Sequence, residues 1–286
     1  MKNAVIPRRY SPPSRFRRRF LFDETGKEKE VNMEWILWLL ATVIALSIGS
    51  FINVVIHRVP LQILQPGNGV DLRQPASHCP VCKKCLRWRD NIPVVSWLLL
   101  RGRCHFCRCA ISLRYPLTET ACATISLLFV ALLPVDKSLL ALLVLFWLLL
   151  TVAIIDYEHY LLPDVITLPL LWLGLLLKAV EWLPGSLRDA VFGAVMGYSA
   201  LWLIRYIYQY FSGRLALGLG DAKLVAALGT WLGWALLPYV LLLACSGAIC
   251  ALFIAKMGWQ RDLHQPLAFG PWIALAGISL FINTII

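Results

Sequence analysis

Long apolar stretches alternate with short polar connections along most of this chain. Several of these stretches approach the roughly 20 apolar residues that an α-helix needs to cross a bilayer. The pattern therefore predicts about eight membrane-spanning helices, of which the sixth is short and carries Gly229 and Gly233. Their expected limits are residues 35–56, 117–133, 139–155, 165–182, 190–211, 223–236, 238–255 and 267–286.

The amino-acid composition agrees with this pattern. Hydrophobic residues make up 59% of the 286 residues, charged residues only 15%, and the chain contains twelve tryptophans. One soluble core of this length would not require so much apolar surface. The expected fold class is an all-α polytopic membrane protein with about eight transmembrane helices and a small domain outside the bilayer between the first and second spans.

The residues before the first apolar stretch differ from the rest of the chain. The first 31 residues carry nine Lys and Arg together with several acids, which is typical of a solvated, disordered arm. The following stretch is too long for the core of a signal peptide and has no clear cleavage site, so we expect a retained anchor. Met33 is a candidate alternative start. The expected divisions are an arm over residues 1–33, a first transmembrane helix over 34–58, a cytoplasmic domain over 59–116 and a transmembrane domain over 117–286.

Two cysteine pairs lie in the polar segment after the first expected span. Cys79 and Cys82 form one C-x2-C pair, and Cys104 and Cys107 form a second pair after 21 intervening residues. Each short turn directs two thiolates at one point, and four thiolates complete a tetrahedral Zn²⁺ site. The segment has few large apolar residues, so a structural zinc ion would supply the free energy that folds it.

Two other interpretations of these cysteines are weaker. Disulfides require an oxidising compartment, whereas the abundant Arg and Lys residues of this segment predict that it faces the cytoplasm. An iron–sulfur cluster would use Cys79, Cys82 and Cys85, but Arg89 occupies the position where the ferredoxin pattern has its fourth cysteine. Cys85 and Cys109 are then expected to be spare thiols close to the zinc site.

The number of spans gives the orientation of the later loops. If the cysteine segment is cytoplasmic, residues 156–164 and 212–221 return to the same side of the membrane. The basic arm then falls on the opposite side, in conflict with the same rule. The side of the membrane on which the N-terminal arm lies therefore stays open.

Two aspartates occupy matching positions in this arrangement. Asp156 ends the third expected span, and Asp221 precedes the sixth span, directly behind the Gly218-Leu219-Gly220 turn. An acid at membrane depth is costly, so it indicates a functional site. Two carboxylates within about 3 Å cannot both ionise, so one activates water while the other protonates the scissile carbonyl. A helix start favours the charged form of Asp221, which makes it the expected ionised partner.

The identity of the second acid is not decided by this chemistry. Asp156 follows a long apolar stretch and is expected closer to the bilayer. Asp164 follows Pro163, so it is either an alternative partner for Asp221 or the N-cap of the fourth expected span.

The motifs resemble the paired signature of the bacterial type IV prepilin peptidases, membrane aspartic proteases of the GxGD class. The first half of the signature is the segment from Asp156 to Asp164, DYEHYLLPD, and the second is Gly218 to Lys223, GLGDAK. The likeness extends to residues 49–60, to both cysteine pairs with residues 90–93 and 96–98 between them, to residues 111–116, and to Phe269-Gly270-Pro271 near the end of the chain. It covers nearly everything after Met33.

The resemblance implies a bifunctional enzyme of the bacterial inner membrane. Such enzymes cut the basic leader from prepilins or type II secretion pseudopilins at the cytoplasmic face, then N-methylate the new terminus with S-adenosylmethionine. The resemblance implies an aspartic peptidase domain over 117–286 and a zinc-ribbon-like domain over 59–116. The implied residues are the catalytic Asp156 and Asp221, the active-site loop residues Gly218, Gly220, Lys223 and Asp164, and the zinc ligands Cys79, Cys82, Cys104 and Cys107.

Membrane lipid and a prepilin or pseudopilin are therefore the expected partners, nucleic acid is not expected, and the sequence does not give the oligomeric state. One alternative is a peptidase without methyltransferase activity, because no adenosylmethionine-binding fingerprint is visible. A second alternative is a transporter or secretion assembly component that uses zinc for docking, but its acids would lie nearer the middle of the spans.

Overall fold

A computed structural model of the chain describes residues 24–285, apart from 68, 70, 73, 75, 80, 214–217 and 260–266. Residues 1–23 of the expected basic arm lie outside this described part. From Glu24 the backbone is helical and runs without interruption into the first expected span, so the helix begins about ten residues before the expected boundary.

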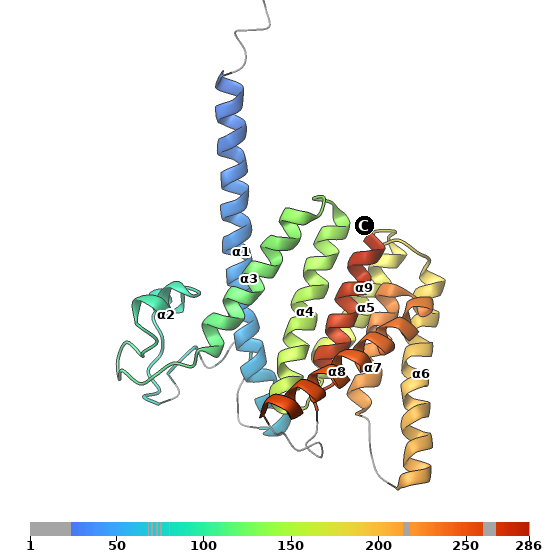
Figure 1. Ribbon diagram of the computed structural model, residues 1–286. Coiled ribbons are helices and arrows are strands. Elements are labelled where there is room, and N and C mark those ends of the chain that lie inside the picture. Colours follow the sequence, from blue (N-terminus) through green and yellow to red (C-terminus); the bar gives the residue numbers. More distant parts are fainter. Residues whose placement is uncertain are drawn as a thin grey trace, which may run out of the picture. The chain divides into compact units, whose positions relative to one another are not determined.

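Within the described residues, a helix lies at each position that the apolar stretches predicted (Figure 1). These helices are α1 (Glu24–Leu64), α3 (Arg114–Leu132), α4 (Lys137–His159), α5 (Asp164–Ala179), α6 (Leu187–Ser212), α7 (Leu219–Leu232), α8 (Leu237–Trp259) and α9 (Gly270–Ile285). The short helices η1 (Trp88–Asn91) and α2 (Val95–Leu99) lie in the polar segment, and η2 (Trp234–Leu236) precedes α8. The all-α class is therefore confirmed.

Five of the helical segments are long and apolar enough to cross a membrane. They are Trp35–Leu64, Arg114–Leu132, Lys137–His159, Leu187–Ser212 and Trp234–Met257. By contrast, α5, α7 and α9 have 16, 14 and 16 residues. A 14-residue helix is about 21 Å long, which is less than the thickness of the hydrocarbon core. Every residue of α7 from Leu224 to Leu232 is buried, so this helix is enclosed by protein and need not match the bilayer.

The chain divides into two compact units, residues 1–44 and 45–286. In the described part of the first unit, the apolar side chains of residues 35–40 are exposed. The second unit contains the main core. There, α7 packs against α5, α6 and α9, and α9 also packs along α4. Trp231 of α7 contacts Phe281 of α9 edge to face, and its Nε1 donates to the carbonyl of Leu170 in α5 over 3.0 Å.

The packing of α7 against α6 depends on glycine. A Cβ atom added at Gly193 of α6 would lie 2.2 Å from the carbonyl oxygen of Gly229 in α7. One turn later, a Cβ at Gly197 would lie 3.0 Å from the carbonyl of Val225. Residues four apart share one helix face, so these glycines let the two backbones touch. This contact fixes the helix that begins with the GxGD segment.

Candidate active site and cysteine cluster

Asp156 lies in the last turn of α4, where 94% of its surface is covered, and it is therefore a buried acid. Its Oδ2 accepts a hydrogen bond from the backbone N–H of Gly270 over 2.8 Å. Gly270 is the first residue of α9, so the positive end of that helix faces the carboxylate. A Cβ on Gly270 would lie 2.7 Å from the same oxygen, so only glycine allows this approach.

Asp221 lies in the first turn of α7, directly after the two glycines of the GxGD segment. The backbone N–H of Gly218 donates to its carboxylate. A Cβ on Gly220 would lie 2.7 Å from Cβ of Leu162, which belongs to the segment after α4. Gly220 thus lets the start of α7 approach the segment that follows Asp156.

The two aspartates lie near one another in the bundle although they are far apart in the chain. The negative charge of Asp156 acts directly on the carboxylate of Asp221. One acid comes from the end of α4 and the other from the beginning of α7. The carboxylates of Asp156 and Asp221 each accept one hydrogen bond from a backbone N–H at a helix start, that of Gly270 and that of Gly218. Backbone hydrogen bonding therefore favours the ionised form of both acids and does not distinguish between them.

Asp164 makes a different contact. Both of its carboxylate oxygens accept hydrogen bonds from Nζ of Lys223 over 2.7 Å. This ion pair joins the first residue of α5 to the first turn of α7. The N-cap of α5 is Pro163, so Asp164 does not have the capping role that was considered for it. The charge of Lys223 is directed at Asp164.

Two further residues contribute to this region, and the sequence motifs assign neither of them a role. Gly270 holds the carboxylate of Asp156, and Arg114 at the start of α3 forms an ion pair with Glu158, two residues after Asp156. Both belong to motifs that carry the family likeness, namely residues 269–271 and 111–116. The family motifs therefore contain both residues, but a motif does not show which groups its residues contact.

The cysteine segment gathers thiols from both pairs. The sulfur atoms of Cys79, Cys104, Cys107 and Cys109 all lie within 4.8 Å of one another. Three of these residues are predicted ligands, and the fourth, Cys109, was expected to be a spare thiol. Cys82 lies outside this group, but its side chain interacts with three of the thiols in it, those of Cys79, Cys104 and Cys107.

The two cysteine turns have the same backbone form. The N–H of Cys79 donates to the carbonyl of Lys84 over 3.0 Å, and the N–H of Cys104 donates to the carbonyl of Cys109 over 2.8 Å. In each turn the residue after the second cysteine of the pair is left-handed, with φ of 57° at Lys83 and 59° at Arg108. The two turns bring the thiols of Cys79, Cys104 and Cys107 together, and Cys109 joins them from the end of the second turn.

Backbone hydrogen bonds favour the thiolate form in this cluster. The N–H of Cys82 lowers the pKa of the Cys79 thiol to about 6. The N–H of Cys107 lowers the pKa of the Cys104 thiol in the same way. Backbone N–H groups also act on Cys82 and Cys107, but neighbouring thiols and burial outweigh them and raise the pKa of both thiols to about 11. The backbone therefore favours the metal-binding thiolate form at Cys79 and Cys104.

Comparison with known families gives two matches. Residues 43–133 match the family described as bacterial Peptidase A24 N-terminal domain, and residues 143–255 match the type IV leader peptidase family. The first match contains the cysteine segment and α3. The second contains Asp156, Asp164 and the whole GxGD segment.

Comparison with known proteins gives relatives that share one name, prepilin leader peptidase/N-methyltransferase. The relative from Dickeya chrysanthemi is 45% identical over 272 residues, which cover 87% of this chain and 94% of the relative. The relative from Stutzerimonas stutzeri is 40% identical over 84% of this chain and 88% of its own length. The relative from Klebsiella pneumoniae is 48% identical over 71% of this chain and 88% of its own length. No solved structure gives a significant match.

Proposed function

The chain belongs to the type IV leader peptidase family, and we propose that Asp156 and Asp221 form its catalytic pair. It is an enzyme with leader peptidase and N-methyltransferase activity, the two activities that its relatives' names give. Its substrates are prepilins, and the proposal includes type II secretion pseudopilins. Cleavage exposes a new N-terminal amine, which then receives a methyl group.

The pair divides the work of hydrolysis between its members. Two interacting carboxylates hold one proton between them, so one is ionised while the other is protonated. The ionised carboxylate takes a proton from the attacking water, and the protonated one donates to the carbonyl of the scissile bond. The backbone N–H groups of Gly270 and Gly218 orient the two carboxylates for this exchange.

One observation carries this proposal. The charge of Asp156 acts on Asp221, and the nearby cation Lys223 is bound to Asp164. Lys223 is thus engaged by Asp164, and the charge that acts on Asp221 is that of the other aspartate. Asp164 then has a supporting role, because it fixes the start of α5 against α7.

Replacement of either member of the pair tests the assignment. Asp156→Asn and Asp221→Asn should each lower leader cleavage by at least about 10²-fold, because each removes an acid–base group from the reaction. Both variants should still methylate a substrate that has already been cleaved. This remaining activity would show that each variant is folded. Cleavage is measured with purified enzyme and a prepilin in phospholipid vesicles.

Asp164→Asn is the matched control. Its side chain is 52% exposed and that of Lys223 is 33% exposed, so the ion pair contributes about 0–1 kcal/mol. Cleavage should stay within a few-fold of the unmodified enzyme. If Asp164→Asn abolishes cleavage and Asp156→Asn does not, the assignment of the pair is wrong.

For the cysteine cluster, we propose a structural Zn²⁺ ion. A tetrahedral ion with Zn–S bonds of about 2.3 Å requires sulfur–sulfur distances of about 3.8 Å. The sulfur of Cys79 lies 3.8 Å from that of Cys107 and 3.5 Å from that of Cys109, close to this spacing, whereas the sulfur atoms of Cys107 and Cys109 are only 3.2 Å apart. Cys79, Cys104 and Cys107 would bind it, with Cys82 or Cys109 as the fourth ligand. The bound ion would supply folding free energy to the segment between the first two spans.

Metal content distinguishes these ligands. Cys104→Ser should lose most of the zinc, because this buried thiol lies inside the cluster. Cys85→Ser is the control, since Cys85 is exposed and outside the cluster. Comparison of Cys82→Ser with Cys109→Ser identifies the fourth ligand as the one whose loss releases zinc. A purified protein that contains iron, or no metal in any preparation, contradicts the zinc proposal.

The membrane placement follows from the same reasoning. Several apolar helices and the relatives indicate a multi-pass protein of the bacterial inner membrane. We propose that the zinc domain over 59–116 and the catalytic pair of the peptidase domain over 117–286 face the cytoplasm, with lipid around the bundle. S-adenosylmethionine is the proposed methyl donor, as the N-methyltransferase activity requires a donor of this class.

A further inference from the structure

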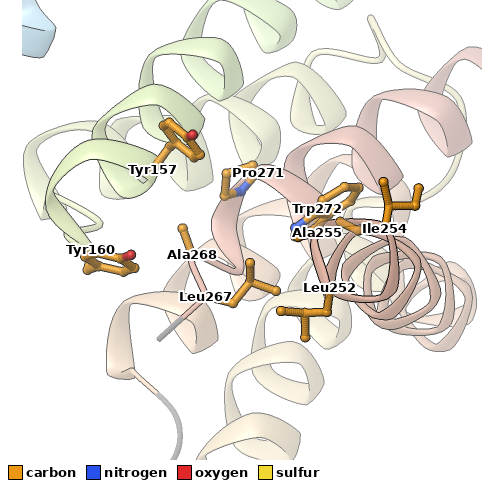
Figure 2. Close-up of a pocket in the computed structure, with 10 residues that line it drawn as sticks. Tyr157, Tyr160, Leu252, Ile254, Ala255, Leu267, Ala268, Pro271 and Trp272 are labelled. Carbon is orange, nitrogen blue, oxygen red and sulfur yellow. The ribbon is translucent and has the colours of Figure 1, made fainter. Parts of the chain in front are cut away.

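An apolar groove of about 740 Å³ is lined by residues from the end of α4, from α8 and from the start of α9. In Figure 2, Tyr157 and Tyr160 from the end of α4 lie on one side of it, and Leu252, Ile254 and Ala255 of α8 lie on the other. Pro271 and Trp272 at the start of α9 lie between these walls. In the part of the chain that the structure describes, no charged side chain lines the groove.

The groove wall contains chain neighbours of two residues of the proposed catalytic centre. Tyr157 directly follows Asp156, and Pro271 directly follows Gly270. The hydrogen bond between Gly270 and the carboxylate of Asp156 therefore joins two residues whose neighbours form the groove wall. A peptide bond held at the aspartates would have one of its flanking segments in the groove.

Tyr160 brings its ring into the groove wall from the end of α4. It ends this helix in the left-handed conformation, with φ of 53°. This conformation ends the helix there, and the Tyr160 ring lines the groove together with that of Tyr157.

We propose that this groove binds the apolar segment of the substrate that follows the scissile bond. The proposal rests on the proposed peptidase function, since the substrate must place its cleavage junction at Asp156 and Asp221. Of the two segments that flank the junction, only an apolar one suits a wall without charged groups, because charged side chains lose their hydration there without gaining a partner. The polar leader then lies on the other side of the aspartates.

The surface next to the groove supports entry from the lipid. On α8, the side chains of Phe253 and Ile254 are 64% and 70% exposed, and Ile254 is also part of the groove wall. Exposed apolar side chains of α8 thus reach the edge of the groove. A membrane-anchored substrate can move into it from the bilayer without exposing its apolar segment to water.

Filling the groove with a bulky side chain tests the proposal. Ala251 lines the groove, whereas the neighbouring Cys250 is exposed and does not line it. Ala251→Trp and Cys250→Trp therefore place the same side chain inside and outside the groove. For a full-length prepilin in phospholipid vesicles, Ala251→Trp should raise KM about tenfold or more, because it displaces a buried apolar side chain of the substrate. Cys250→Trp should leave KM unchanged. Equal KM values for both variants overturn the proposal.

Cross-linking keeps the test decisive if Ala251→Trp does not fold. A photoreactive phenylalanine analogue at position 255, in the Asp221→Asn background, should cross-link to the substrate on the mature side of the junction. Cross-links to the leader alone, or none, contradict the groove assignment. If the groove variants behave like the unmodified enzyme while Asp221→Asn abolishes cleavage, the proposed function stands and only the groove is wrong. Normal cleavage by Asp221→Asn refutes the proposed function itself.

Discussion

The carboxylate of Asp156 is positioned by a residue 114 positions further along the chain. The N–H of Gly270 donates to its Oδ2, and a Cβ at Gly270 would lie 2.7 Å from that oxygen and 3.1 Å from the Asp156 Cβ and Cγ atoms. These distances are below ordinary van der Waals contact, so a side chain at Gly270 would displace the carboxylate. The backbone of Gly270 therefore has as large a part in placing the acid as the helix that carries it.

Gly270→Ala should lower the turnover number for leader cleavage by about 10²-fold, because a displacement of about 1 Å in a reacting group has this effect. Methylation of a substrate that has already been cleaved should change little. Leu275→Ala is the control, since this residue of the same helix is 60% exposed. Cleavage kinetics with purified protein measure the effect. A well-folded Gly270→Ala protein with normal turnover contradicts this account of the carboxylate.

At the scale of elements, the position of α7 decides where Asp221 lies. This helix is enclosed by its neighbours and touches α6 backbone to backbone at Gly193 and Gly229. Helices in lipid gain little from apolar burial against one another, so their association depends on close packing of small residues. The contact is also rigid, because a Cβ at Gly193 would meet backbone atoms of Gly229, which cannot rotate away.

Gly193→Val should therefore separate α6 from α7 and destabilise the bundle by about 1–3 kcal/mol or more. Thermal unfolding in detergent measures the loss, and leader cleavage should fall with it because α7 carries Asp221. Met196→Val introduces the same side chain at a position on α6 that is 53% exposed, and it should change stability by less than about 0.5 kcal/mol. Equal stability of the two variants argues against the glycine contact.

At the scale of the whole molecule, the order of the helices sets which loops share a side of the membrane. The chain enters α4 after the loop at residues 133–136 and leaves it beside Asp156. That loop and the aspartate pair thus lie at opposite ends of a helix that is long enough to cross the bilayer. The abundance of Arg and Lys in the cysteine segment predicts that the aspartate end is cytoplasmic.

Thiol labelling in right-side-out spheroplasts checks this orientation. A cysteine introduced at Val135, which is 85% exposed in the connecting loop, should react with a membrane-impermeant maleimide. Cys85, exposed in the cysteine segment, should react only after the membrane is permeabilised. Mass spectrometry assigns the label to each site. The reverse pattern of labelling would place Asp156 and Asp221 on the side of the membrane opposite the cytoplasm.

The sequence by itself determined the fold class and the position of each long helix. Lipid cannot satisfy backbone N–H and C=O groups, so a long apolar stretch at membrane depth becomes a helix whatever its neighbours are. The motifs also singled out Asp156, Asp221 and the cysteines. The exact limits were harder to predict, because α1 begins in a charged segment and α5, α7 and α9 are short helices whose ends depend on packing.

Only the tertiary structure decided which of these residues meet. It paired Asp164 with Lys223, joined Gly270 to Asp156, and brought Cys109 into the thiol cluster beside three of the four predicted ligands. Hydrophobic periodicity depends on residues within a few turns of each other, so it carries no information on contacts between distant segments. Those contacts depend on how closely two backbones can approach, and here glycines at the helix interfaces set that approach.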